Sequence, residues 1–339
     1  MKRRPTIIDV ARAAGVSKTT VSRVVGSEAD KVREETRQRV LDAIEELGYT
    51  HNAVASSLRT DRTNIIMLAI PDITNPFWPA VARGVQDVMD QEGYAVVFAN
   101  SDWDSEREEM FLEMARRNRF DAILINPVQV KNDALKALHL PTVLIGSHED
   151  YPDFDSVGSD SYGATRLALT HLYDLGHRQI GLIRGQRQSR LGYSRLRGYQ
   201  DFLEEKGIPL DQRLIATVPF DEEGGRLAFQ QLVAVDQPPT AVFASNDILA
   251  IGALQGAHEA GLTVPDDLSI IGMDDIYAAS TTMPPLTTVA KPQYEIGQRA
   301  ALFLVDRLVE KRPFSPSRRH LFKCTLHERG STSCPRFLD

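Results

Sequence analysis

Short hydrogen-bonding side chains and cations gather near the N-terminus, between residues 6 and 25. Thr6 and Ser17 are good helix caps, and Gly15 favours the left-handed conformation that ends a helix, so two short helices joined by a tight turn are predicted. The start and outer face of the second helix then present Ser17, Lys18, Thr19, Ser22 and Arg23. Such hydroxyls and cations can bond to base edges and phosphates in a DNA major groove.

A small apolar core must hold these helices together. The residues that could form it are Ile8, Val10, Ala11, Ala14, Val16, Val21 and Val24. A third helix is predicted from about Arg33 to Leu47, where Gly48 ends it. Glu34 and Glu35 suit the positive end of that helix, although the capping position holds an arginine.

Charge is unevenly distributed along the 339 residues. Residues 1–27 hold six basic side chains and one carboxylate, a net charge of +5. Residues 65–339 hold 27 basic and 37 acidic side chains, a net charge of −10. A basic segment joined to an acidic body indicates a nucleic-acid-binding module attached to a domain with another task. The alternative is an ordinary helical hairpin with a solvated face.

Residues 6–25 read T-x-x-D-V-A-x-x-A-G-V-S-x-x-T-V-S-R-V-V, and the pattern continues through Leu47-Gly48-Tyr49 and residues 52–59. This stretch closely resembles the DNA-binding headpiece of the lactose-repressor (LacI) family. The resemblance implies that the second helix enters the major groove, and that Lys18 and Thr19, at positions where family members vary, set the operator preference. The headpiece side chains expected to bind DNA are Thr6, Ser17, Lys18, Thr19, Thr20, Ser22 and Arg23.

Residues 51–64 form the expected linker, in which Asn52 can cap a short helix that runs to Leu58. The family resemblance implies a hinge helix that orders on DNA, with Leu58 wedged into the minor groove. The linker residues expected to bind DNA are Asn52, Ala55, Leu58 and Arg59. The alternative is a plain linker whose leucine packs on the body.

From Ile65 onward, apolar runs typical of buried strands alternate with helical segments. Strands are predicted at Ile65–Ile70, Ala95–Ala99, Ala122–Ile125 and Thr142–Ile145, then near Ile180–Ile183, Leu214–Val218, Ala241–Ala244 and Ser269–Ile271. The predicted fold class is therefore α/β, with an all-α headpiece and two doubly wound parallel-sheet subdomains. Ligands of such sheets bind beyond the carboxyl ends of the strands, here in a cleft between the subdomains.

This body resembles the periplasmic sugar-binding-protein-like core of the same family, so the resemblance covers essentially the whole chain. It implies a headpiece at 1–50, a hinge and linker at 51–64, and an effector-binding and dimerisation domain at 65–339. Within that domain, the N-subdomain would comprise about 65–160 and 291–320, and the C-subdomain about 161–290 and 321–339. The last strand, around Leu321–Leu326, is expected in the C-subdomain.

Aromatic rings, carboxylates, amides and an arginine follow the predicted strands and would face the cleft. The expected effector-binding residues are Asp72, Asn75, Phe77, Trp78, Asp102, Asp160, Arg195, Phe220, Asn246 and Asp274. Arg195 matches the family's effector-binding arginine in the pattern R-x-x-G-[FYW], and its five donors can fork onto hydroxyls or a carboxylate. Because carboxylates accept from vicinal hydroxyls and rings stack on C–H faces, the expected effector is a sugar or sugar derivative.

Other interpretations of these groups stay open. Phe77 and Trp78 could sandwich a nucleobase instead of a sugar. The segment from Asp72 to Trp78 could also be a capped helix with an aromatic core, and Asp102-Trp103 a surface loop.

Enzyme classes lack support, since the chain has no phosphate-binding loop, dinucleotide-binding turn, nucleophile elbow or metal-spaced histidine cluster. We expect no cofactor and no metal, and Cys324 and Cys334 are expected to be reduced. No run of about 18 apolar residues and no signal peptide are found, so a cytoplasmic protein without membrane contact is expected.

Together these features predict a transcriptional regulator, in the first place a repressor, whose operator affinity is switched by a small molecule in the cleft. The family's C-terminal heptad extension for tetramers is absent, so a homodimer is expected to read a pseudo-palindromic double-stranded operator. The alternatives are a purine- or nucleobase-responsive co-repressed regulator and a small-molecule-binding protein without a regulatory role.

Overall fold

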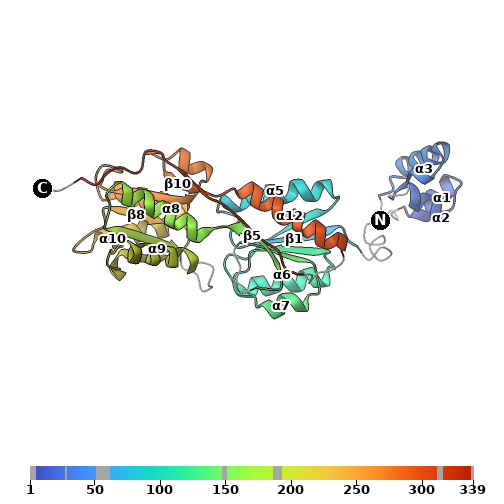
Figure 1. Cartoon of the computed structure of the whole chain (residues 1–339). Coiled ribbons are helices and arrows are strands. Elements are labelled where there is room, and N and C mark those ends of the chain that lie inside the picture. Colours follow the sequence, from blue (N-terminus) through green and yellow to red (C-terminus); the bar gives the residue numbers. More distant parts are fainter. Residues whose placement is uncertain are drawn as a thin grey trace. The chain divides into compact units, whose positions relative to one another are not determined.

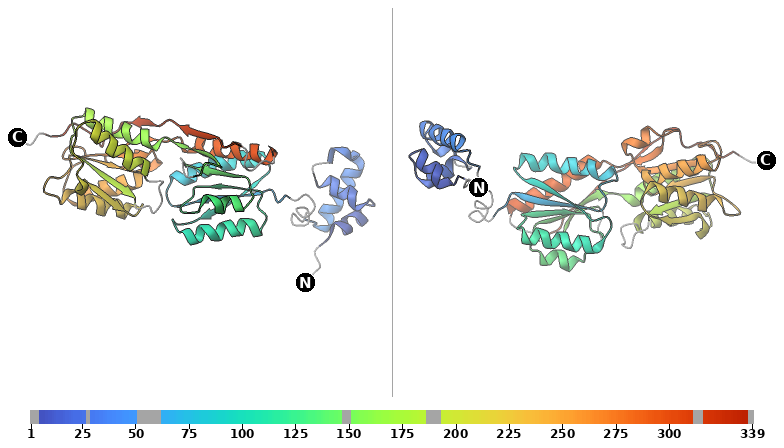
Figure 2. Two further views of the ribbon diagram at one scale, coloured as in Figure 1. Left: turned by 60° about the horizontal axis from the view of Figure 1, so that its bottom comes forward. Right: turned by 180° about the vertical axis from the view of Figure 1, so that it is seen from behind.

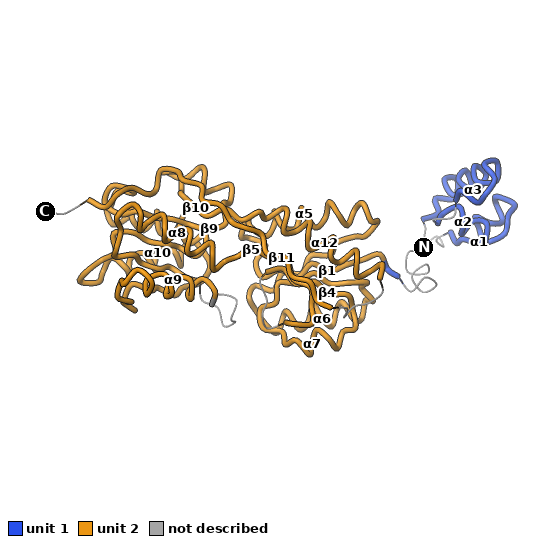
Figure 3. Tube along the Cα trace, viewed as in Figure 1, with its two compact units in different colours: residues 1–63 blue, residues 64–339 orange. Residues whose placement is uncertain are grey.

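The computed structural model describes residues 5–26, 29–50, 62–146, 151–185, 193–310 and 316–336. The chain divides into two compact units, residues 1–63 and 64–339 (Figure 3). None of the helices in the described ranges has the length and apolar character needed to cross a membrane.

In the described residues of the first unit, three helices form a bundle: α1 (Ile7–Ala13), α2 (Lys18–Val24) and α3 (Glu34–Leu47). Gly15 and Gly48 have φ angles of 65° and 61°, the left-handed conformation predicted for the residues that end α1 and α3. The buried core consists of Val10, Ala11, Ala14, Val21, Val24, Val40 and Ala43.

The sequence placed Ile8 in this core, and that prediction is wrong because its side chain is 54% exposed. Ile7, by contrast, packs against the core together with Val10 and Ala11. Positions i, i+3, i+4 and i+7 share one helix face, and Ile8 lies one position outside that stripe.

The N-subdomain of the second unit is built on a six-stranded parallel sheet in the order β11-β5-β4-β3-β1-β2. Its strands are β1 (Ile65–Ile70), β2 (Ala95–Asn100), β3 (Ala122–Ile125), β4 (Thr142–Ile145), β5 (Asp155–Ser159) and β11 (Arg319–Phe322). Helices α5 (Phe77–Gln91) and α12 (Gln293–Glu310) cover one face, and α6 (Ser105–Arg117) and α7 (Asn132–Ala137) cover the other (Figure 1).

The C-subdomain repeats this architecture with the strand order β12-β10-β9-β8-β6-β7. Its strands are β6 (Ile180–Gly185), β7 (Ile215–Val218), β8 (Ala241–Ala244), β9 (Ser269–Asp274), β10 (Thr287–Ala290) and β12 (Thr325–His327), of which β12 is antiparallel. Helices α8 (Ser161–Asp174) and α9 (Tyr193–Glu205) pack on one face, and α10 (Glu222–Val233) and α11 (Asp247–Glu259) on the other (Figure 2). The predicted α/β class with two doubly wound sheets is thereby confirmed.

Among the described elements, the chain crosses between the two subdomains three times: from β5 to α8, from β10 to α12 and from β11 to β12. The prediction of one last strand around Leu321–Leu326 in the C-subdomain is confirmed for Leu326 and wrong for Leu321. Arg319–Phe322 pairs with β5 in the first sheet, and Thr325–His327 pairs with β10 in the second. The apolar residues Leu321 and Leu326 therefore belong to different sheets.

Strand β5 was not predicted, although all of its residues are buried. Its sequence, Asp-Ser-Val-Gly-Ser, lacks the apolar run that marks the other central strands. Asp155 can be buried there because Arg307 and Arg318 donate hydrogen bonds to its carboxylate. Gly158 permits a close approach, because a Cβ at this position would lie 2.6 Å from the backbone of Gly146.

Candidate DNA-binding face and effector cleft

Local hydrogen bonds fix the start of both headpiece helices. The Thr6 amide and hydroxyl donate to the Asp9 carboxylate at 2.9 and 2.7 Å. Ser17 caps α2, since its hydroxyl accepts from the Thr20 amide at 3.0 Å and lies 2.8 Å from the Thr20 hydroxyl. Three of the predicted DNA-binding hydroxyls therefore set the position of the helices.

The side chains of Ser17, Lys18, Thr19 and Arg23 are exposed on α2, and Thr20 and Ser22 are partly buried. The helix thus presents two cations and short hydroxyls on one surface, which suits contacts to phosphates and base edges. The predicted hinge contacts Asn52, Ala55, Leu58 and Arg59 lie outside the described residues.

In the second unit, a cleft with a free volume of about 750 Å³, partly open to solvent, lies at the carboxyl ends of the strands. It is lined by Asn75, Phe77, Trp78, Trp103, Asn126, Ile145, Gly146, Gly158, Ser159, Ser161, Ser194, Arg195, Phe220, Asn246, Asp274, Lys291 and Ile296. Because these residues come from both sheets, the cleft lies between the two subdomains, where the sequence predicted it.

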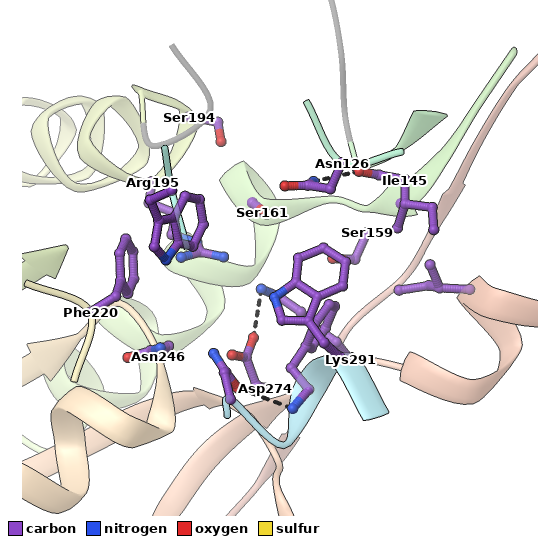
Figure 4. A pocket seen from close by; sticks show the side chains of 17 residues that line it. Asn126, Ile145, Ser159, Ser161, Ser194, Arg195, Phe220, Asn246, Asp274 and Lys291 are labelled. Carbon is purple, nitrogen blue, oxygen red and sulfur yellow. Dashed lines mark hydrogen bonds and ion pairs between the residues drawn. The ribbon is translucent and has the colours of Figure 1, made fainter. Parts of the chain in front are cut away.

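The polar centre of the cleft contains Arg195, Asn246, Asp274 and Lys291 (Figure 4). Lys291 donates to the Asp274 carboxylate at 2.8 Å, and both residues are buried. Asn246 caps α11, with its carbonyl oxygen accepting from the Leu249 amide at 3.0 Å. The buried Nε of Arg195 has no hydrogen-bond partner among the described residues.

Burial lowers the pKa of Arg195 and of Lys291, because both cations lose hydration. The charge of Arg195 lowers the pKa of Lys291 further, whereas Asp274 raises the pKa values of both cations. Each cation is thus placed where a ligand acceptor would stabilise its charged form.

Two aromatic rings stack at the cleft, one from each subdomain. The centroids of Trp103 and Phe220 are 5.7 Å apart and the rings are inclined by 18°. Asp102 and Trp103 have φ angles of 50° and 61°, a conformation that costs a non-glycine residue roughly 1–2 kcal/mol. Trp103 was noted in the sequence only as a neighbour of Asp102, yet it is the residue of that pair that lines the cleft.

Three predicted effector ligands, Asp72, Asp102 and Asp160, lie outside the lining of this cleft. Each carboxylate is used in a local turn or cap. Asp72 accepts from the Thr74 amide at 2.8 Å and from its hydroxyl at 2.6 Å.

The other two carboxylates serve the same purpose. Asp102 accepts from the Asn100 side chain at 2.5 Å and pairs with Arg107, which holds the turn that carries Trp103. Asp160 caps α8 by accepting from the Gly163 amide at 2.8 Å. Short acidic side chains that follow strands readily bond to nearby backbone amides, and this local role prevails here.

Sequence reasoning missed Lys291 and Asn126, which are the most polar of the additional lining residues. Lys291 directly follows β10, and Asn126 directly follows β3. The available signal was position alone, since a polar residue immediately after a buried strand faces the ligand-binding edge of the sheet. Glu108 holds the loop that follows Asn126, because its carboxylate accepts from the amides of Val128 and Val130, both at 2.7 Å.

Another buried carboxylate, that of Asp247, lies near the polar centre. Asp247 accepts from the Ile276 amide at 2.9 Å and from the Thr288 hydroxyl at 2.6 Å. Burial and the nearby charge of Asp274 raise the pKa of Asp247 to about 7. Within the described ranges, the His, Cys, Asp and Glu side chains form no group of three or more that could hold a metal ion.

Comparison with known proteins agrees with both halves of this description. The sequence model of bacterial regulatory proteins of the lacI family matches residues 6–52, and that of the periplasmic binding protein-like domain matches residues 169–332. The chain is 37% identical over 331 residues to the HTH-type transcriptional repressor CytR of Escherichia coli (strain K12), covering 96% of each chain. The chain belongs to the lacI family of bacterial regulatory proteins.

Solved lacI-family structures share this fold. The Lac repressor dimer bound to operator and the anti-inducer ONPF has a TM-score of 0.84 and 26% identity, covering 98% of this chain and 100% of that one. A lacI-family regulator of Enterococcus faecium with bound ribose has a TM-score of 0.71 and 32% identity, covering 80% of this chain and 99% of that one. The chain is therefore a DNA-binding transcriptional regulator with an effector-binding domain, and not an enzyme.

Proposed function

We propose that the chain is a homodimeric repressor that binds a pseudo-palindromic operator and responds to a sugar or sugar derivative in the cleft. The observation that carries the effector class is the arrangement of Arg195, Asn246 and Asp274 beside stacked aromatic rings. Amides, a guanidinium and a carboxylate can satisfy vicinal hydroxyls, while rings cover the apolar face of a sugar. The E. faecium relative, solved with ribose, supports this choice.

A nucleobase is the second candidate effector. The rings of Trp103 and Phe220 are inclined by only 18°, with centroids 5.7 Å apart. A modest separation of the two subdomains would admit a planar ring between them, and stacking of that kind is favourable.

The proposed dimer has support from the Lac repressor, which was solved as a dimer on its operator. Two copies of α2 in one complex would read two half-sites related by the dimer axis. As a regulator that acts on bacterial DNA, the protein would work in the cytoplasm.

A direct experiment tests this function. An operator is first selected from randomised DNA with the full-length protein, and gel shifts then measure its affinity with and without a panel of sugars and nucleobases. The proposal requires sequence-specific binding of about 10⁻⁸ M or tighter that at least one compound changes severalfold. Binding without sequence preference, or no response to any compound, would refute it.

Replacing Lys18 with Ala is expected to change which operator is preferred. Lys18 is exposed at the first position of α2, from which it can reach base edges. Replacing Arg3, which precedes α1, is the charge-matched control and is expected to weaken binding to all sequences about equally. Binding-site selection measures both effects, and the same consensus for the Lys18 variant would contradict the assignment.

Replacing Leu58 with Ala is expected to weaken operator binding by more than tenfold and to reduce DNA bending. A hinge helix over residues 52–58 would be too short to be stable alone, so it would form only with DNA and the partner hinge. A leucine wedge would provide part of that support by kinking the operator. Gel-shift bend assays measure the change, and effector affinity serves as the control. If the variant bends the operator as strongly as the wild type does, the hinge acts only as a tether and the wedge assignment is contradicted.

A further inference from the structure

The charges in the described cleft do not balance. Its lining contains two cations, Arg195 and Lys291, and one carboxylate, Asp274. Lys291 and Asp274 are 6% and 4% exposed and form an ion pair of 2.8 Å, so each neutralises the other. The guanidinium of Arg195 is left as the uncompensated charge.

The buried Nε of Arg195 also lacks a hydrogen-bond acceptor among the described residues, although a guanidinium carries five donors. Buried charges are ordinarily paired, because an unpaired charge in a poorly hydrated site is unfavourable. The ammonium of Lys291, whose charge Asp274 balances, lines the same space (Figure 4).

The carboxylates behind the lining have other partners. Asp247 accepts from Thr288 and from the Ile276 amide, and its pKa is raised to about 7, so it is only partly ionised at neutral pH. Asp275 pairs with Arg329 at 2.6 Å and with His327 at 2.8 Å. Neither carboxylate lines the cleft, so the described residues leave the acceptor for Arg195 to a ligand.

We infer that the effector carries an anionic group, a carboxylate or a phosphate, which binds beside Arg195 and Lys291. This inference rests on the proposed function, because it concerns the effector of the same cleft. Asn126, Asn246 and the aromatic rings remain available for the hydroxyls and the apolar face of the molecule. The effector class is therefore a sugar acid or a sugar phosphate, and a neutral sugar would leave the cation without a counter-charge.

Calorimetry with the full-length wild-type protein tests the inference with matched compounds. The probes are glucose, gluconate and glucose 6-phosphate, and ribose, ribonate and ribose 5-phosphate, all at one ionic strength. We expect at least one anionic compound to bind on the order of 30-fold more tightly than its neutral parent. The acid and the phosphate separate the two anionic sources. Neutral parents that bind equally well or better, or no binding by any anionic probe, would overturn the inference.

Variants test whether the preference for an anionic compound arises in the cleft. Lys291→Gln is expected to reduce the preference for the anionic compound by about tenfold or more, whereas Lys291→Arg should retain it. Lys323→Gln removes the same charge from an exposed residue outside the lining and should change nothing. Melting temperatures show whether each variant is folded, and an unchanged preference in folded Lys291→Gln would contradict the inference. If that variant does not fold, the calorimetric comparison of anionic and neutral compounds with the wild-type protein still tests the inference.

Operator gel shifts separate this inference from the proposed function. Sequence-specific DNA binding that responds only to a neutral sugar keeps the proposed function and overturns the anionic effector. Tight binding of an anionic sugar without any operator binding gives the opposite result.

Discussion

Replacing Arg195 with Ala is expected to weaken effector binding by roughly thirty- to a hundred-fold and to leave operator affinity in the absence of effector unchanged. The guanidinium lines the cleft and its Nε has no partner among the described residues, so the ligand would use donors that no other group occupies. Losing a set of charge-assisted hydrogen bonds costs on the order of 2–3 kcal/mol, which corresponds to this change in affinity.

Arg197 offers a matched control on the same helix. It is 64% exposed, pairs with Asp201 at 3.4 Å and lies outside the cleft lining, so Arg197→Ala should leave effector affinity at the wild-type value. Calorimetry with the compound that the gel shifts identify measures both variants. Equal effector affinities of the two variants would contradict the assignment of Arg195 to the effector site.

Replacing Asp155 with Ala is expected to lower the free energy of unfolding by about 3–5 kcal/mol. The Asp155 carboxylate is buried in β5 and accepts from Arg307 at 2.6 and 2.9 Å and from Arg318 at 2.8 Å. Without it, the Arg307 guanidinium, only 3% exposed, remains inside the protein without its carboxylate. Urea unfolding of the full-length chain measures the loss.

Asp306→Ala is the control for this network. Asp306 pairs with the same Arg318 at 2.7 Å but is 53% exposed, so its loss should cost about 1 kcal/mol or less. A comparable loss of stability in both variants would show that the buried position of Asp155 does not matter.

The contribution of Asp155 to the free energy of unfolding should also depend on pH. Burial acts to raise the pKa of Asp155, but hydrogen bonds from Arg307 and Arg318 outweigh it, and the pKa is lowered. A carboxyl group whose folded-state pKa is lowered stabilises the fold above its unfolded pKa of about 3.9, and this contribution is lost as pH falls through the folded pKa. The stability difference between wild type and Asp155→Ala should therefore shrink below about pH 4.

The sequence predicted the elements in which local pattern and burial agree. Apolar runs such as Ile65–Ile70 and Ala122–Ile125 are strands in the structure, and Gly15 and Gly48 end helices as expected. Strand β5 escaped prediction because its polar residues are buried through partners that are distant in sequence, as with Asp155 and Arg307. Such pairs form only once the fold has brought them together.

The sequence predicted where the cleft lies, but only some of the residues that line it. Arg195, Asn246 and Asp274 lie in family patterns and line it as expected. Asp72 lies outside the lining and bonds twice to Thr74 instead, and a turn carboxylate and a ligand carboxylate look alike in sequence. Lys291 was missed because β10, the short strand Thr-Thr-Val-Ala that it follows, was not predicted as a strand.

Because the described elements of the chain cross between the subdomains three times, neither subdomain can finish folding until most of the chain has been synthesised. Helix α12 supplies Ile296, Ala300 and Leu304 to the core of the first sheet, yet it is synthesised after β6 to β10 of the second. One apolar face of the first sheet therefore stays partly uncovered while residues 160–290 emerge, and exposed apolar surface of this kind promotes aggregation. Nascent chains stalled in that interval are natural targets for chaperones, and truncation before β11 leaves both sheets incomplete.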